Sequence, residues 1–388
     1  MGTGNPGSIA SVIKIFVPLK SYRTTVNKLS IILPGLVLVF ISCTKDTISD
    51  QAIGAPIVAD RLNLDPVEFP FGTLSEYGFF DGPMANQRPV AGGVPFQPIN
   101  TLFTDYAHKK RFMWMPAGTQ ATYNGDGEVL DFPDGTVLIK NFFYDHVQPT
   151  DRTRIIETRL MFKRNGAWEF ADYVWNEEQT EGYLDLMGSN PPITWIDDNG
   201  TERSTLYRIP SEAECLTCHK SNDLAIPIGP KPQNLNGPFA YRDGVKNQLD
   251  HLAEVGYLSD RRPKRIRTVP HWEDTGLSLN DRVRGYVDIN CAHCHKEYSH
   301  CDYRPMRFAF NETDDPVNLG VCVPPDDPLL PQHTHIISRG SVGRSLLHYR
   351  LASTDEAVRM PLLGRTLVHD EGLALITDWI NSLEPACP

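Results

Sequence analysis

The sequence is poor in basic residues and has no long hydrophobic run. Lys and Arg number 37 against 48 Asp and Glu, which gives a formal net charge of −11 over 388 residues. An acidic chain repels the phosphate backbone, so we expect no binding to nucleic acid. The apolar run from Leu29 to Ile41 has 13 residues, which is too short for a membrane-spanning helix. The chain also contains no recognisable hydrolase motif.

The first 43 residues lack acidic residues altogether, and this absence indicates an export signal. Four basic residues precede or open the apolar run, which ends at Ser42 and Cys43. A basic segment, a short apolar segment and a small residue before the cleavage site are typical of signal peptides. Without residues 1–43 the net charge becomes −15. We therefore expect an exported, acidic protein.

The residues Phe40 to Cys43 resemble the lipobox of bacterial lipoproteins. This resemblance implies lipidation of Cys43, a polar tether over residues 44–61, and a lipid anchor on the periplasmic side of a bacterial membrane or at the cell surface. An ordinary cleaved signal peptide with a free periplasmic product is the alternative.

Residues 62–210 predict a β-rich domain. Two segments, 135–144 and 154–163, are rich in β-branched and aromatic residues. Asn165-Gly166 separates the second segment from a similar run at 167–175, which is a strong hairpin signal. A second hairpin is predicted to join 193–196 to 204–207. Such closely spaced hairpins favour a β-sandwich or barrel.

Four of the eight cysteines lie in two copies of one pattern. The copies are Cys215-Leu216-Thr217-Cys218-His219 and Cys291-Ala292-His293-Cys294-His295. In C-x-x-C-H the two thiols can bond to the vinyl groups of one porphyrin while the histidine binds its iron. The sequence therefore predicts two covalently attached haem c groups.

Zinc and disulfides are the alternatives for these cysteines. Two C-x-x-C pairs can hold one tetrahedral zinc ion. However, 72 residues separate Cys218 from Cys291, and a four-thiolate site uses neither histidine. A pair of disulfides also leaves both histidines unexplained. Both alternatives are therefore weaker than haem.

Three further cysteines remain after Cys43 and the haem motifs: Cys301, Cys322 and Cys387. Exported proteins can keep disulfides, and three thiols allow one intrachain bond. We expect Cys301 to pair with Cys322, because both flank the loop after the second motif. A pairing with Cys387 stays open.

The second motif is flanked by two predicted helices. Residues 277–289 have apolar residues at helical spacing, with Gly285 allowing close approach to another element, and residues 370–383 repeat that spacing. Met360-Pro361 lies in the loop before the last helix. We interpret His293 and His300, within and after the motif, as surface residues.

With NCAHCH, RMPLLGR and ITDWINSL, residues 278–383 resemble a class I cytochrome c domain. This resemblance implies that Cys291 and Cys294 hold the haem, His295 is the proximal ligand and Met360 is the distal ligand. A thioether opposite imidazole favours Fe(II) and raises the reduction potential. An ordinary core methionine is the alternative for Met360.

The first motif has no obvious distal ligand. No methionine occurs between His219 and Met306, and a Pro-rich loop, IPIGPKPQNLNGP, follows the motif. His251, on a predicted short helix, is one candidate for a bis-histidine haem. A residue from another part of the chain, such as His271, Met113 or Met115, can instead supply the distal ligand of the first haem. Alternatively, the iron stays five-coordinate and binds a small molecule.

The whole mature chain resembles a family of exported bacterial di-haem proteins of unassigned activity, through TLFTDYAHKKRFMWMPAG, FPDGTVLIKNF and IETRLMF. The expected fold is multidomain β + α. The β-rich domain (62–210) precedes a first haem-binding segment (211–269) and a mostly α-helical cytochrome c domain (270–388).

Single-electron transfer between a redox protein donor and a redox protein acceptor is the leading functional hypothesis, because it needs tuned haems but no acid or nucleophile. A di-haem peroxidase or oxidase, with catalysis at the first haem, is the main alternative. In a third interpretation, the β domain is a binding module with attached redox haems.

Overall fold

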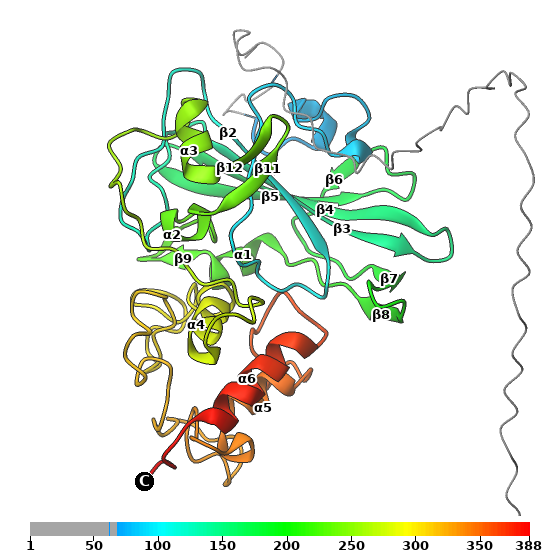
Figure 1. The fold of residues 1–388 in the computed structure, drawn as a ribbon. Helices are drawn as coiled ribbons and strands as arrows, with labels where there is room; N and C mark the ends of the chain where they lie inside the picture. Colours follow the sequence, from blue (N-terminus) through cyan, green and yellow to red (C-terminus); the bar gives the residue numbers. More distant parts are fainter. Residues whose placement is uncertain (1–61, 63–67) are drawn as a thin grey trace, which may run out of the picture. The chain divides into compact units, whose positions relative to one another are not determined.

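The structure is a computed structural model that describes residue 62 and residues 68–388 (Figure 1). The predicted signal peptide, the lipidation site Cys43 and the tether over residues 44–61 lie outside the described residues. Within the part that is described, no helix is long and apolar enough to cross a membrane.

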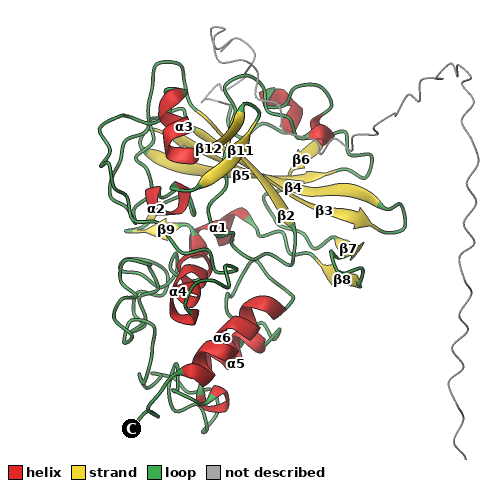
Figure 2. Cartoon of the chain, in the orientation of Figure 1, coloured by secondary structure: helices red, strands yellow, loops and turns green. Residues whose placement is uncertain are grey.

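The β-rich part forms one eight-stranded antiparallel sheet (Figure 2). Strands β1 to β6 are neighbours in chain order, and β7 branches off β3 and pairs with β8. The strands are β1 (Val94–Pro95), β2 (His108–Trp114), β3 (Val137–Val147), β4 (Arg152–Arg164), β5 (Ala167–Trp175), β6 (Gly182–Leu184), β7 (Pro192–Ile196) and β8 (Glu202–Leu206). The predicted β-rich structure is therefore present, but as a single branched sheet and not as the expected sandwich or barrel.

Both predicted hairpins are confirmed. Strands β4 and β5 are joined by Asn165 and Gly166, which have φ angles of 53° and 79°. Positive φ at both loop residues gives the twist that a two-residue hairpin needs, and Asn and Gly adopt it most easily. Strands β7 and β8 form the second hairpin, with Ile193 opposite Thr205.

The two faces of the sheet pack against different parts of the chain, because successive side chains of a strand alternate between faces. Phe112 of β2 packs with the N-terminal short helices η2 (Leu74–Tyr77) and η3 (Met84–Asn86) on one side. Its neighbour Met113 packs on the other side with Leu249 and Tyr257 from the segment after the first motif. The sheet and residues 211–269 thus share a core.

The segment 211–269 is made of short elements that cover this second face. It contains α1 (Glu212–Cys218), β9 (Lys220–Ser221), β10 (Leu224–Ala225), α2 (Pro232–Leu235), β11 (Pro238–Tyr241), β12 (Gly244–Asn247) and α3 (Gln248–Glu254). Helix α1 contacts β5 of the sheet. The predicted short helix around His251 is confirmed as α3.

The C-terminal region contains α4 (Leu279–Asn290), η4 (Val342–Arg344), α5 (Leu346–Ala352) and α6 (Asp370–Ser382). The predicted helices before the second motif and at the C-terminal end are both confirmed. Gly285 of α4 meets Pro270, because a Cβ there would lie 2.2 Å from the Pro270 oxygen. The close approach expected at this glycine is therefore confirmed.

The region 270–388 is not mostly helical, contrary to our expectation. Its three α-helices have 12, 7 and 13 residues, and turns and loops form most of the rest. The apolar faces of α4 and α6 pack together through Val283, Ile376 and Trp379, so the two predicted helices still organise the core.

The disulfide joins Cys322 to Cys387, so the expected bond between Cys301 and Cys322 is wrong. The tail after α6 returns to the loop at Cys322, with a Cα–Cα distance of 5.3 Å. Cys301 is buried and carries a free thiol. Its backbone N–H donates to the Cys294 oxygen at 2.9 Å, which holds it beside the second motif. Nearness in sequence did not identify the bonded pair.

Candidate cofactor site

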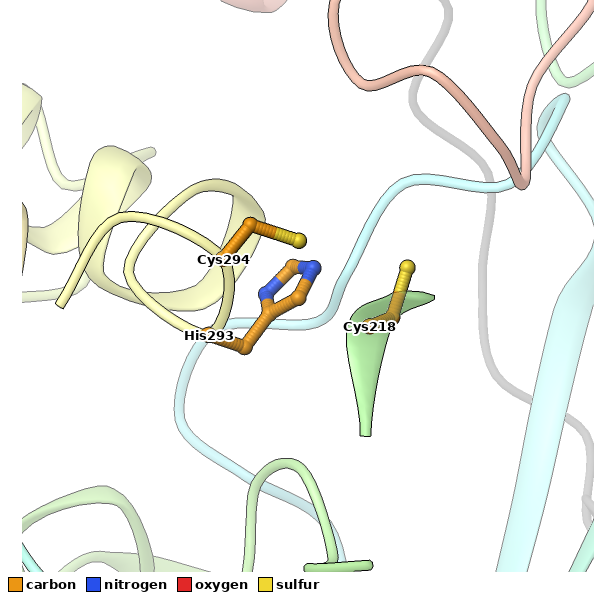
Figure 3. A group of neighbouring side chains, drawn as sticks. All are labelled: Cys218, His293 and Cys294. Carbon is orange, nitrogen blue, oxygen red and sulfur yellow. The ribbon is translucent and has the colours of Figure 1, made fainter. Parts of the chain in front are cut away.

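The two C-x-x-C-H motifs meet in space although 72 residues separate them. The ligand atoms of Cys218, His293 and Cys294 all lie within 4.8 Å of one another. Figure 3 shows these three side chains pointing toward one another, Cys218 from α1 and the other two from the turn after α4. The thiol of Cys294 also donates to the Thr217 oxygen at 3.4 Å.

The first motif lines a cavity of about 150 Å³ between α1 and the sheet. Helix α1 begins after Ser211, whose backbone N–H donates to the Glu214 carboxylate at 2.9 Å in a capping box. Cys215 and Cys218 lie one turn apart on this helix, and both line the cavity with His219. The Pro-rich loop supplies apolar wall residues: Pro227, Ile228 and Pro230.

His219 is held in the orientation that a metal ligand needs. Its Nδ1 donates to the Ile226 oxygen at 2.8 Å, which leaves Nε2 as the free acceptor. Its ring packs edge-on against Phe170 of β5, with 5.3 Å between the centroids. Burial lowers the pKa of His219 to about 4, so the imidazole is neutral at pH 7, as ligation requires.

The second motif lines a separate cavity of about 250 Å³. Cys291, Cys294, His295 and Met360 all contribute to its wall. Helix α4 leads directly into the motif, and the His295 N–H continues the turn by donating to the Cys291 oxygen at 3.0 Å. The Met360 N–H donates to the Arg350 oxygen at 3.1 Å. The structure thus brings together the two residues expected as axial ligands.

The two cavities share a wall. Cys218, His293, Pro361 and Leu363 line both of them. Groups bound in the two cavities would therefore be separated by little more than these side chains. This arrangement suits electron exchange between them.

The other proposed ligands of the first iron line neither cavity. His251 is a buried residue of α3, and its ring lies tilted against that of Tyr241 with 3.6 Å between the centroids. Met113 and Met115 are fully buried in the core that residues 211–269 share with the sheet. His271 is exposed. The structure therefore does not support His251 as a ligand, nor the three alternatives.

His293 was missed by the sequence interpretation. It is only 8% exposed and lines both cavities, so its assignment to the surface is wrong. Its Nδ1 has no hydrogen-bond partner among the described residues. His300 is exposed, as expected. His293 is buried and His300 is exposed because the first motif packs against the second motif at His293.

A row of four charged residues on the sheet faces the first cavity. Arg111, Lys140, Arg159 and Asp172 come from strands β2, β3, β4 and β5, and each is the direct cross-strand partner of the next. Directly opposite residues lie on the same face of a sheet, and all four line the cavity. Each of the four strands contains more than one charged residue, so the sequence alone did not single out this row, and we did not predict it.

Only one end of this charged row is neutralised. Arg159 donates to the buried Glu157 at 2.6 and 2.8 Å and lies 3.4 Å from Asp172. Burial, together with the charge on Glu157, raises the pKa of Asp172 well above its usual range. Asp172 and Glu157 are hydrogen-bonded to each other.

The other end of the row, formed by Arg111 and Lys140, makes no ion pair among the described residues. Arg111 is 7% exposed, its Nη1 has no hydrogen-bond partner there, and burial lowers its pKa to about 10. The Lys140 ammonium lies over the Phe142 ring, 4.5 Å from its centroid. Burial, with Arg111 and Arg159 nearby, lowers the pKa of Lys140. Such a pair suits a carboxylate ligand.

Comparison of the chain with protein-family models, curated proteins and solved structures found no match.

Proposed function

We propose that the protein is an exported di-haem cytochrome that carries single electrons between a redox protein donor and acceptor. One observation carries this proposal: two complete C-x-x-C-H motifs each line a cavity of their own, and the cavities share a wall. Two adjacent covalent haems form a relay, which needs positioned cofactors but no acid or nucleophile.

The residues around both cavities fit haem. Each motif presents two cysteines and one histidine to the same space, and the His219 Nδ1–H is already engaged by a carbonyl, as for most metal-bound histidines. Arg111 and Lys140 are available to the acidic propionates of the first haem. Bound haem would supply the Fe(III)/Fe(II) couple.

The second cavity supports the finer proposal of a class I cytochrome c-like domain. Helices α4 and α6 pack together, the motif follows α4, and the Met360 loop precedes α6. His295 and Met360 would bind the iron of a haem held there, and the thioether would raise its potential. Electrons entering at the first haem would pass toward the second.

We further propose that the protein is a lipoprotein held to a membrane through Cys43. The basic, acid-free start, the short apolar run and the lipobox-like residues support this localisation. The acidic mature chain favours a basic redox partner. Metabolic labelling with a fatty-acid analogue tests the anchor, and a Cys43→Ser variant should lose the label.

Haem stoichiometry tests the proposal directly. The protein should be expressed with its export signal in a host that matures c-type cytochromes. Mass spectrometry and the pyridine haemochrome assay should then find two covalent haems per chain. The double variants Cys215→Ala/Cys218→Ala and Cys291→Ala/Cys294→Ala should each keep one, whereas Cys301→Ser should keep both. A wild-type protein without covalent haem refutes the proposal.

A di-haem peroxidase or oxidase is the second candidate, favoured by the charged row beside the first cavity. A peroxidase needs polar groups and an open position at one haem, and Arg111 and Asp172 provide unpaired polar atoms there. If the reduced protein binds carbon monoxide and turns over peroxide with an artificial donor, this candidate replaces simple electron transfer. Two low-spin, six-coordinate haems remove it.

A soft metal ion is the third candidate, favoured by the cluster of Cys218, His293 and Cys294. Two thiolates and an imidazole suit zinc. The zinc and haem proposals exclude each other, because covalent attachment of the two haems would convert the thiols of Cys218 and Cys294 to thioethers. Elemental analysis of the purified protein would find about one zinc per chain if this candidate holds, and two irons if the haem proposal holds.

A further inference from the structure

We infer that His293 is the second axial ligand of the iron in the first cavity. The inference rests on the proposed function, since it requires haem at Cys215, Cys218 and His219. It means that the motif that binds one haem also supplies a ligand to the other.

His293 lies where the two cavities meet. His293 follows α4 in the second motif, yet it lines the first cavity as well as the second. Its ring nitrogen lies within 4.8 Å of the Cys218 sulfur, which belongs to the first motif (Figure 3). His293 and His219 are the two imidazoles that line the first cavity.

The burial of the His293 ring also supports this ligand assignment. Buried polar atoms are nearly always paired, and each exception calls for an explanation. His293 is 8% exposed and its Nδ1 has no hydrogen-bond partner within the described part of the chain. The corresponding atom of His219 is already bonded to the Ile226 oxygen. The Nδ1 of His295, the expected ligand of the second iron, is unpaired in the same way. The His293 side chain hydrogen-bonds to Cys218, so Nε2 is the nitrogen that faces the first motif, and a neutral imidazole nitrogen is a common metal ligand.

A thioether, from Met161, and an amine, from Lys140, also line the first cavity and could in principle bind iron. Both side chains make other contacts. Met161 is 9% exposed and packs in the apolar cluster that includes Leu138. The Lys140 ammonium lies over the Phe142 ring. His293 is therefore the best candidate for the second ligand in this cavity.

Coordination by His293 would separate the potentials of the two haems. Imidazole on both sides of the first iron gives a lower potential than imidazole and thioether at the second. Because the same five-residue turn would touch both haems, their relative positions would be rigidly coupled. The first haem is then the low-potential entry and the second the exit.

His293→Ala tests this inference without altering haem attachment, because residue 293 is an x position of C-x-x-C-H. The wild type should contain two low-spin haems, and neither should bind carbon monoxide when reduced. The variant should keep two covalent haems, of which one becomes high-spin and binds carbon monoxide. Added imidazole should restore the low-spin spectrum.

His293→Met and His300→Ala complete the experiment. The Met variant should show a second sulfur-to-iron near-infrared band and a raised potential at one haem. His293→Met also tests the inference if His293→Ala folds poorly, because the methionine side chain fills the space that histidine occupies. His300→Ala, with an exposed histidine near the motif, should match wild type.

Two results would overturn the inference. Two low-spin haems in His293→Ala with unchanged potentials would assign the ligand to another residue, such as Met161 or Lys140. A wild-type protein with one high-spin, five-coordinate haem would show that no ligand is present. Absence of covalent haem from wild type would instead refute the proposed function, so the two failures are distinguishable.

Discussion

The thiol of Cys294 donates a hydrogen bond of 3.4 Å to the main-chain oxygen of Thr217. This contact joins the second cysteine of one C-x-x-C-H motif to a residue between the cysteines of the other. It brings the two cavities together at Cys218 and His293, which line both. Substitutions around this junction separate the contributions of the neighbouring groups.

Met360→Ala should lower the reduction potential of the second haem and abolish its sulfur-to-iron near-infrared band, because the thioether is lost. Redox titration and near-infrared spectroscopy measure both effects. Met306→Leu is the matched control, since Met306 also lines the second cavity. If the band survives in the Met360 variant and disappears in the Met306 variant, Met306 is the ligand.

Arg111→Met should lower the potential of the first haem, because removal of a buried positive charge favours Fe(III). One charge at an effective dielectric of about 20 corresponds to a change on the order of tens of millivolts. Arg164→Met is the control, because Arg164 pairs with Glu169 at the hairpin end of β4 and does not line the cavity. Equal changes in the reduction potential of the first haem in both variants would show that the charged row has no special influence on it.

Asp172→Asn should make the protein more stable than wild type at high pH and equally stable at low pH. Burial raises the pKa of Asp172 above its unfolded value, so the folded state binds the extra proton. Wild-type stability therefore falls as pH rises from the unfolded pKa of about 4 through the folded pKa. Each tenfold difference in proton affinity between the two states corresponds to about 1.4 kcal/mol. The amide mimics the neutral acid and removes this loss.

Urea unfolding at pH 5 and pH 9 measures this effect. Glu157→Gln is the contrasting variant, because it deprives Arg159 of its buried carboxylate partner. It should destabilise the protein at both pH values. A stability difference between Asp172→Asn and wild type that does not change with pH would mean that Asp172 is ionised in the folded protein.

Cys387→Ser should reduce the free energy of unfolding by about 2–4 kcal/mol, because the disulfide with Cys322 closes a long loop in the unfolded chain. Cys301→Ser, which removes a free thiol, should have a smaller effect. Denaturant unfolding compares the variants. Peptide mapping without reductant should recover the peptides of Cys322 and Cys387 joined, and a Cys301–Cys322 peptide would contradict the structure.

Features encoded by contiguous residues were predictable from the sequence. Asn165-Gly166 predicted the hairpin between β4 and β5, because two adjacent residues determine the backbone of a two-residue turn. The apolar spacing before Cys291 predicted α4 in the same way. The chemistry of each C-x-x-C-H motif is likewise contained in five residues.

The tertiary structure alone decided which distant groups meet. His293 and His300 lie in the same short segment, and only the approach of α1 buries one of them at the first cavity. The charged row requires the register of four strands, and Cys387 reaches Cys322 only because the chain reverses after α6. A local pattern specifies backbone geometry over a few residues, whereas contacts across tens of residues depend on how the whole core packs.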